Sequence, residues 1–307
     1  MNEHSPTQDR PLLGILLMLG FCVMAPIGDA LAKLLSTQMP MGQLVLTRFV
    51  VQALILVPIV VATRRQWRMS ARVLRLVVWR TLLHIAGIAC MFTSLRYLPL
   101  ADAVAIAFVM PFIMLILGKF FLNEDVGLRR ILACVVGFSG TLMVIQPSFA
   151  DVGAPALLPV AVAFIFAFFM LITRKVAKDV DPIAMQVVSG VIATALLAPA
   201  LLLGSTSGIA DLAFVVPDTH VFWLLLAIGV AGTVAHLLMT WSLRYAPSTT
   251  LAPMQYIEIP LAALVGWIVF SDWPNGLAAL GICVTMGAGL YVMLRERATL
   301  RRSLATP

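Results

Sequence analysis

Long apolar runs separated by short polar connections fill almost the whole chain. A transmembrane helix needs about 20 predominantly apolar residues, and a window of that length finds ten candidate spans. They are residues 12–34, 41–62, 74–95, 101–121, 128–146, 156–174, 183–203, 220–241, 249–270 and 276–294. Barrel strands would alternate polar and apolar positions over about 10 residues, and these runs do not alternate. The pattern therefore predicts an all-α polytopic membrane protein.

The connections between the spans are short. The longest, near 63–73 and 204–219, have too few residues for a soluble domain, so we expect function to reside in the membrane. Composition agrees, because 61% of the residues are hydrophobic, 11% are charged and the mean hydropathy is +1.02. The polar N-terminal segment Met1–Pro11 contains one arginine, and no small-residue cleavage site precedes the first apolar span. We therefore expect the first span to stay in the mature chain.

The position of the basic residues predicts an orientation. A net charge of +7 would suggest nucleic acid as a partner of a soluble chain, but in a membrane protein the location of the charge matters more. With a cytoplasmic N-terminus, the inner segments hold 17 Lys and Arg residues and the outer segments hold 2. We predict that both termini are cytoplasmic, with residues 1–11 as an N-terminal tail and 295–307 as a basic tail. No nucleic-acid partner is expected.

Motifs of enzyme chemistry are absent from the sequence. It contains no glycine-rich phosphate loop, no HExxH pair and no GxSxG elbow. The four cysteines lie inside apolar spans without metal-ligand spacing and are interpreted as packing residues. We predict no catalytic residue, no metal and no cofactor. A membrane-embedded enzyme or sensor remains the alternative of a different class, because such clusters can assemble from distant spans.

An internal repeat relates the two halves of the chain. Ser94–Pro99 reads SLRYLP and Ser242–Pro247 reads SLRYAP, 148 residues further on. The same shift aligns, without a gap, Met91 with Met239, Gly118 with Gly266, Glu124 with Asp272 and Leu142 with Leu290. Five spans are repeated, and because five is odd the second copy must lie upside down. The repeat predicts two inverted five-helix halves, the arrangement typical of alternating-access transporters, with a substrate site between them.

Several segments resemble a known family. SLRYLPLADAVAIAF, PFIMLILGKFFLNE, YIEIPLAALVGWIVFSD and the Arg-Phe pair in LVLTRFV are similar to the EamA-type branch of the bacterial drug/metabolite transporter superfamily. The resemblance covers residues 12–294 and implies one repeat in 12–146, a second in 156–294, and a place in the bacterial inner membrane. It also implies that helices 1 to 4 and 6 to 9 surround a cavity, with helices 5 and 10 more peripheral.

The same resemblance places two charged residues in that cavity, Arg48 of the second helix and Glu258 of the ninth. The chain departs from the family's common Glu-Pro pair, since Ile259 separates Glu258 from Pro260.

Glu258 is the strongest site candidate on physical grounds as well. An ionisable group near the bilayer centre is costly unless it is paired, hydrated or neutralised. Glu258 lies near the middle of the ninth span, with Gln255 one turn earlier and Tyr256 beside it. We expect either a proton-exchanging or substrate-binding carboxyl, or a buried structural hydrogen bond or salt bridge.

Asp29 and Arg48 lie at similar depth near the outer ends of the first two spans, and Gln52 shares the face of Arg48. One interpretation is an Asp29–Arg48 ion pair. The other is an outer gate or an anion-binding arginine, whose planar fork suits a carboxylate. Pro26 and Gly28 favour a broken first helix, although packing alone could explain both.

Three further basic residues lie within spans. Arg80 either snorkels to the cytoplasmic headgroups or belongs to the site. His84 lies deeper on the same face, and His236 stands one turn from the repeat position of His84. Each histidine is either a packing residue or a proton relay. Together these side chains indicate a net-basic cavity wall, which favours a substrate with a carboxylate, a phosphate or an electron-rich ring.

Small residues in the fifth and tenth spans allow close helix approach. They are Gly137, Gly140, Gly287 and Gly289. The contact could lie within one chain or between chains, so monomer and homodimer stay open.

We predict a secondary transporter that moves a small organic metabolite by alternating access, driven by protons or by the substrate's own gradient. The alternatives are an exporter of amino acids or other carboxylates and a riboflavin-type carrier. The expected partners are the substrate, the lipid bilayer and protons.

Overall fold

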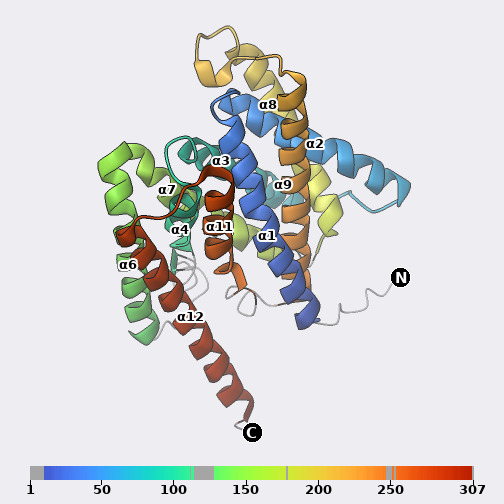
Figure 1. The fold of residues 1–307 in the computed structure, drawn as a ribbon. Coiled ribbons are helices and arrows are strands. Elements are labelled where there is room, and N and C mark those ends of the chain that lie inside the picture. The colour runs from blue at the N-terminus through green and yellow to red at the C-terminus, as the bar shows by residue number, and fades with distance from the viewer. Residues whose placement is uncertain are drawn as a thin grey trace, which may run out of the picture.

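All regular structure in the described part of the chain is helical (Figure 1). The computed structural model describes residues 10–110, 112–113, 128–177, 179–246, 251 and 254–305. Seven helices among these residues are long and apolar enough to cross a membrane. The prediction of an all-α polytopic membrane protein is therefore confirmed at that level.

The first half of the chain contains α1 (Pro11–Leu35), α2 (Met41–Ala62), α3 (Ala71–Ser94), α4 (Leu100–Ala107) and α6 (Leu128–Val152). The second half contains η1 (Ala154–Leu157), α7 (Leu158–Val176), α8 (Pro182–Gly204), η2 (Ala210–Leu212), α9 (Thr219–Tyr245), α11 (Glu258–Phe270) and α12 (Gly276–Ala305). Most bounds lie within a few residues of the predicted spans. Helix α12 continues past the predicted end of the last span, through residues that we expected as a tail.

Local sequence explains where several helices begin. Ser70 accepts a hydrogen bond from the Val73 N–H at the start of α3, and Asp218 accepts one from Val221 at the start of α9. Asp181 accepts from two backbone N–H groups of α8, whose first residue is a proline. These side chains satisfy donors that the first helical turn leaves free.

The fourth and ninth predicted spans are interrupted. Helix α4 ends at Ala107 and a turn follows at residues 108–109, while α11 begins at Glu258 after a turn at 256–257. The two turns are 148 residues apart, which equals the shift of the sequence repeat. Pro260, which cannot donate a backbone hydrogen bond, lies in the first turn of α11, where that bond is not needed. The parts of these two predicted spans at 111 and 114–121 and at 249–250 and 252–253 lie outside the described residues.

The first helix is not broken, so that expectation is wrong. Helix α1 runs continuously from Pro11 to Leu35 with Pro26 inside it. A proline removes one helical hydrogen bond, and α1 packs along α9 over much of its length, which holds the remaining turns in place.

The main helix contacts join the two halves of the chain. Helix α1 packs against α9, α3 against α7, α2 against α8, α4 against α11, and α6 against α12. Figure 1 shows α1 beside α9 and α11, with α6 and α12 together at one side of the molecule. The largest buried apolar cluster draws on helices from both halves.

Glycine allows the close approach of α6 and α12 within one chain. A Cβ on Gly140 would lie 2.8 Å from the Gly281 carbonyl oxygen, and a Cβ on Gly281 would lie 2.5 Å from that of Gly140. Gly137 and Gly289 instead make room for aromatic rings, those of Phe112 and Tyr256. A Cβ on Gly287 would meet nothing within 4 Å, so Gly287 makes no close helix contact within this chain.

Candidate functional site

A cavity of about 140 Å³ lies between the two halves. Its walls come from α1, α2, α3, α4, α7, α9 and α11, together with the turns next to α4 and α11. No described lining residue comes from α6 or α12, which were expected to be peripheral. None comes from α8 either, which differs from the implied place of the seventh helix beside the cavity. Among the described residues, five polar side chains line it: Asp29, Arg48, His236, Gln255 and Glu258.

Most of the cavity wall is apolar. Aromatic rings and methionines line it, including Phe21, Met24, Phe92, Phe108, Phe166 and Met170. Our site prediction missed these residues. They are apolar positions within apolar spans, and the sequence pattern does not distinguish a cavity-facing ring from one that faces lipid.

Arg48 is 3% exposed and reaches α9 rather than α1. Its Nη2 lies 2.9 Å from His236 Nδ1 and donates to the Gly232 carbonyl oxygen at 3.3 Å. His236 Nδ1 also lies 3.1 Å from the Gly232 carbonyl oxygen. Nδ1 accepts from Arg48 in the tautomer that carries its proton on Nε2, and it donates to Gly232 in the other tautomer. Within the described part of the chain, Arg48 Nη1 and His236 Nε2 have no hydrogen-bond partner.

The expected Asp29–Arg48 ion pair is not formed. The three ion pairs between described residues do not include it, although both side chains line the cavity. A Cβ on Gly232 would lie 2.6 Å from Arg48 Nε, so this glycine makes room for the guanidinium to turn toward α9. Arg48 lines the cavity, and its role as an outer gate or an anion-binding arginine stays a prediction.

The structure brings the two histidines together. Their ring centroids are 4.3 Å apart with the planes tilted by 37°. His84 is fully buried behind His236, outside the cavity lining, between the rings of Phe49 at 5.2 Å and Phe169 at 4.8 Å. Among the described residues, neither ring nitrogen of His84 has a hydrogen-bond partner. The repeat had suggested that the two positions are related, and they are in contact.

Arg80 does not snorkel to the headgroups. Its side chain is fully buried, Nε donates to Thr173 Oγ1 at 2.8 Å, and Nη1 donates to Ser189 Oγ at 3.0 Å. The guanidinium carbon lies 4.5 Å from the centroid of the Phe169 ring. The hydroxyls of α7 and α8 give it two polar partners inside the protein. Among the described residues, its Nη2 has no hydrogen-bond partner. Arg80, Phe169, His84 and His236 thus follow one another as neighbouring planar groups, and Arg48 joins them through its hydrogen-bond contact with His236. We call these five residues the ring column.

Gln52 faces α8 and not the cavity. Its Nε2 donates to the Gln186 carbonyl oxygen at 2.7 Å. The Gln186 side chain in turn donates to the His236 carbonyl oxygen at 3.1 Å and to Thr240 Oγ1 at 3.2 Å. These bonds fix α2, α8 and α9 behind the ring column. We did not predict Gln186, although a glutamine inside an apolar span was the signal.

Glu258 and Gln255 face the cavity, whereas Tyr256 between them does not line it. Glu258 is the first residue of α11, directly after the turn at 256–257. Tyr256 is 3% exposed, its ring centroid is 5.5 Å from that of Phe108, and it fills the space above Gly289. The interrupted helix thus turns the carboxyl into the cavity and the phenol ring into the core.

Comparison with known proteins agrees with this arrangement. The model of the EamA-like transporter family matches the chain twice, over residues 12–146 and 154–295. A solved structure with 17% sequence identity superimposes with a TM-score of 0.65, covering 95% of this chain and 99% of the other, which shows a shared fold. The chain is therefore a member of the EamA-like transporter family, in the drug/metabolite transporter superfamily.

The curated relatives are transporters of different small molecules. The chain is 28% identical to a riboflavin transporter of Brucella anthropi, over 73% of this chain and 78% of the relative. It is 24% identical to an S-adenosylmethionine uptake transporter of Rickettsia bellii, over 92% and 94%. It is also 26% identical to a pseudopaline exporter of Pseudomonas aeruginosa, over 88% and 90%. Membership of this family establishes that the protein is an integral membrane transporter of a small molecule.

Proposed function

We propose that this protein is a secondary transporter that carries a small organic metabolite across the bacterial inner membrane by alternating access through the cavity. The observation that carries the proposal is the cavity itself, which lies between the halves and presents both carboxyl groups and basic groups. A substrate bound there contacts both halves, so a movement of one half against the other can expose it to either side of the membrane.

The proposal includes ten helices in two inverted repeats, 12–146 and 156–294. The helix contacts support it, because they keep their pattern when the halves are exchanged. The first helix of one half packs against the third of the other, as α1 with α9 and α7 with α3. Helices with the same place in each half also pair, as α2 with α8 and α6 with α12. The turns at 108–109 and 256–257 fall at the same repeat position.

The cavity suggests the chemistry of the substrate. Arg48 and His236 offer a basic wall, Asp29 and Glu258 offer carboxyls, and rings and methionines fill the space between. We propose a metabolite with an anionic or electron-rich group and an apolar or aromatic body. Amino acids, other carboxylates and flavins fit that description. At about 140 Å³ the cavity is smaller than the roughly 300–1,000 Å³ of typical ligand sites, so a flavin-sized substrate would require it to widen.

Glu258 is the proposed coupling group. It is a carboxyl within a mostly apolar cavity, where proton binding would remove the cost of its charge. Loading and release of a proton at Glu258 would then link transport to the proton gradient. The positive-inside distribution supports cytoplasmic termini.

The first experiment is a thermal-shift screen of the detergent-purified protein against flavins, amino acids, organic acids and purines at two pH values. A ligand of the folded state raises the unfolding temperature by mass action. The hit is then used as a radiolabelled substrate in proteoliposomes with an imposed pH gradient. We expect Arg48→Ala to remove the thermal shift, and Glu258→Gln to abolish gradient-driven uptake while leaving the protein folded.

Matched controls are Arg75→Ala and Asp151→Asn, which change exposed charges away from the cavity. Both should behave like the parent protein. Uptake by Glu258→Gln that still follows the pH gradient would refute its coupling role. Uptake that survives Arg48→Ala with unchanged affinity would refute the proposed binding site.

A further inference from the structure

Contacts within the ring column join the first half of the chain to the second. Arg48 on α2 bonds His236 on α9, at 2.9 Å. His84 on α3 packs against His236 and against Phe169 of α7. Arg80, also on α3, lies over the Phe169 ring and donates to hydroxyls of α7 and α8. A movement of one half against the other therefore separates the members of the column.

The column also contains polar atoms without partners. In the described part of the chain, five of its buried side-chain atoms make no hydrogen bond: Arg48 Nη1, Arg80 Nη2, His84 Nδ1, His84 Nε2 and His236 Nε2. A buried polar atom without a partner is costly, and folded proteins contain few of them. Water would satisfy these atoms if the column opened. Their hydration would then offset part of the packing that opening removes.

The ring column begins at the cavity and runs toward the end of the molecule at which α3 starts. Arg48 and His236 line the cavity, and His84 lies behind His236. Arg80 is one helical turn nearer to the start of α3 than His84. The column therefore leads away from the cavity along α3, toward the end that is the inner one in the proposed orientation.

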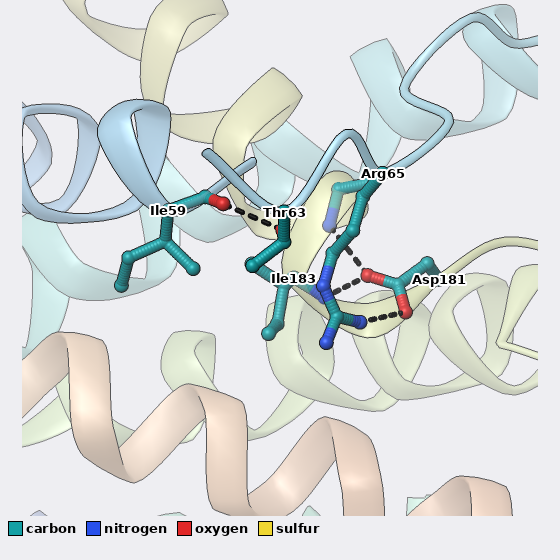
Figure 2. A network of polar contacts seen from close by, with 6 residues as sticks. Ile59, Thr63, Arg65, Asp181 and Ile183 are labelled. Atoms are coloured by element: carbon teal, nitrogen blue, oxygen red, sulfur yellow. Dashed lines mark hydrogen bonds and ion pairs between the residues drawn. The ribbon is translucent and has the colours of Figure 1, made fainter. Parts of the chain in front are cut away.

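A second cavity lies at that end. Val77 of α3, Val176 of α7 and Met185 of α8 form a buried apolar layer, and Val73 packs against this layer and also lines a cavity of about 500 Å³. The described wall of that cavity includes the polar side chains of Arg65, Arg68, Ser70, Asp179, Asp181 and Arg244. Figure 2 shows Arg65 reaching Asp181 there, at 2.7 Å. Along α3 the order is thus cavity, ring column, apolar layer and second cavity.

The charge of the column suits an anion. Its polar side chains are two arginines and two histidines, and no ion pair between described residues includes any of them. Thr173 and Ser189 add hydroxyls beside Arg80. An anionic group that left Arg48 would meet a second guanidinium at Arg80, whose Nη2 is free among the described residues. A cation on the same path would meet only uncompensated positive charge.

We propose that the ring column is the inner gate of the cavity and that it opens into a passage for the anionic group of the substrate, with Arg80 as a second anion-binding position after Arg48. This inference rests on the transport function proposed above. The passage runs between α3 of the first half and α7 and α8 of the second, so parting of the halves opens it.

The test measures whether the column opens and which charge then enters it. Ser189, which is fully buried beside Arg80, is changed to cysteine in the full-length protein after its native cysteines are replaced by alanine. Without substrate, the purified protein is treated with anionic sulfonatoethyl or cationic trimethylammonioethyl methanethiosulfonate. The rate for each reagent is divided by its rate at the exposed Thr206→Cys.

We expect Ser189→Cys to react while the protein is folded, with a normalised rate about tenfold higher for the anionic reagent. Arg48→Gln and Arg80→Gln should each lower that preference by about threefold, because each removes one positive charge from the passage. Equal normalised rates for the two reagents, unchanged by both substitutions, would overturn the anion passage. A thiol that reacts only after denaturation would overturn the gate.

His84→Phe separates opening of the gate from local unfolding. Phenylalanine keeps a ring but has no nitrogen for water to satisfy, and an apolar replacement of a buried polar group is often neutral or stabilising. Labelling of Ser189→Cys should fall by about fivefold, with an unchanged or higher unfolding temperature. His220→Phe, the same change at an exposed position on α9, is the control and should alter neither.

Faster labelling together with a lower unfolding temperature in His84→Phe would show that the reagent enters by unfolding, which would overturn the gate. Because labelling needs no substrate, a preference for the anionic reagent would support the passage even if every metabolite in the panel failed to bind. A transported metabolite combined with a column that never reacts would leave the transport proposal intact and refute only the passage.

Discussion

At the scale of single residues, the ring column is the most unusual feature. It buries two arginines and two histidines with no carboxylate paired to them in the described part of the chain. Hydroxyls, a backbone carbonyl and stacked rings take the place of counter-ions. Such an arrangement depends on the planar, forked shape of the guanidinium, which binds two acceptors and stacks on a ring at the same time.

Arg80→Lys should therefore destabilise the protein although it keeps the charge. A lysine ammonium cannot reach Thr173 and Ser189 in the same geometry or stack on Phe169, so we expect the free energy of unfolding to fall by about 1–3 kcal/mol. Thermal unfolding in detergent measures this, with Arg75→Lys on the exposed face of α3 as the control. An unchanged unfolding temperature in Arg80→Lys would show that the fork geometry does not matter.

At the scale of helices, the pairing of α6 with α12 depends on backbone contact. The carbonyl oxygen of Gly281 lies close to where a Cβ on Gly140 would be, and the carbonyl oxygen of Gly140 lies close to where a Cβ on Gly281 would be. Because rigid backbone cannot yield as a flexible side chain does, even a single added carbon forces the two helices apart.

We expect Gly140→Ala to lower the free energy of unfolding by about 1–3 kcal/mol. Gly287→Ala in the partner helix is the matched control, since its Cβ meets nothing within 4 Å. Alanine is also the better helix former, so Gly287→Ala should leave stability unchanged or raise it by up to about 1 kcal/mol. Equal losses in both variants, measured by thermal unfolding, would contradict the backbone contact.

At the scale of the whole molecule, the orientation in the membrane is open to a direct test. Thr206, in the connection between α8 and α9, and Gln66, in that between α2 and α3, are both exposed and lie on opposite sides in the proposed topology. In intact cells a membrane-impermeant maleimide should label Thr206→Cys but label Gln66→Cys only after the membrane is opened. The parent chain, with its native cysteines, measures the background. The reverse pattern would invert the proposed topology.

The helical class and most helix bounds could be predicted from the sequence, because a membrane span is marked by its length and its apolar composition. The repeat also singled out His84 and His236 as related positions, but it did not predict their contact. Other features follow from packing between distant helices and could not be predicted. The turn of Arg48 toward Gly232, the burial of Arg80 against α7 and α8, and the orientation of Tyr256 away from the cavity each depend on a neighbour far away in the chain.

The interruptions at 108–109 and 256–257 have a consequence for the protein's history. They fall at the same place in both copies, and their neighbouring rings, Phe108 and Tyr256, meet in the folded molecule. A defect in a helix that recurs at an equivalent position is most simply inherited from one ancestor rather than acquired twice. The ancestral gene would then have encoded a single copy of the family's unit that already carried the interruption, and duplication and fusion would have joined two such copies. The contact between Phe108 and Tyr256 would descend from a contact between two identical subunits.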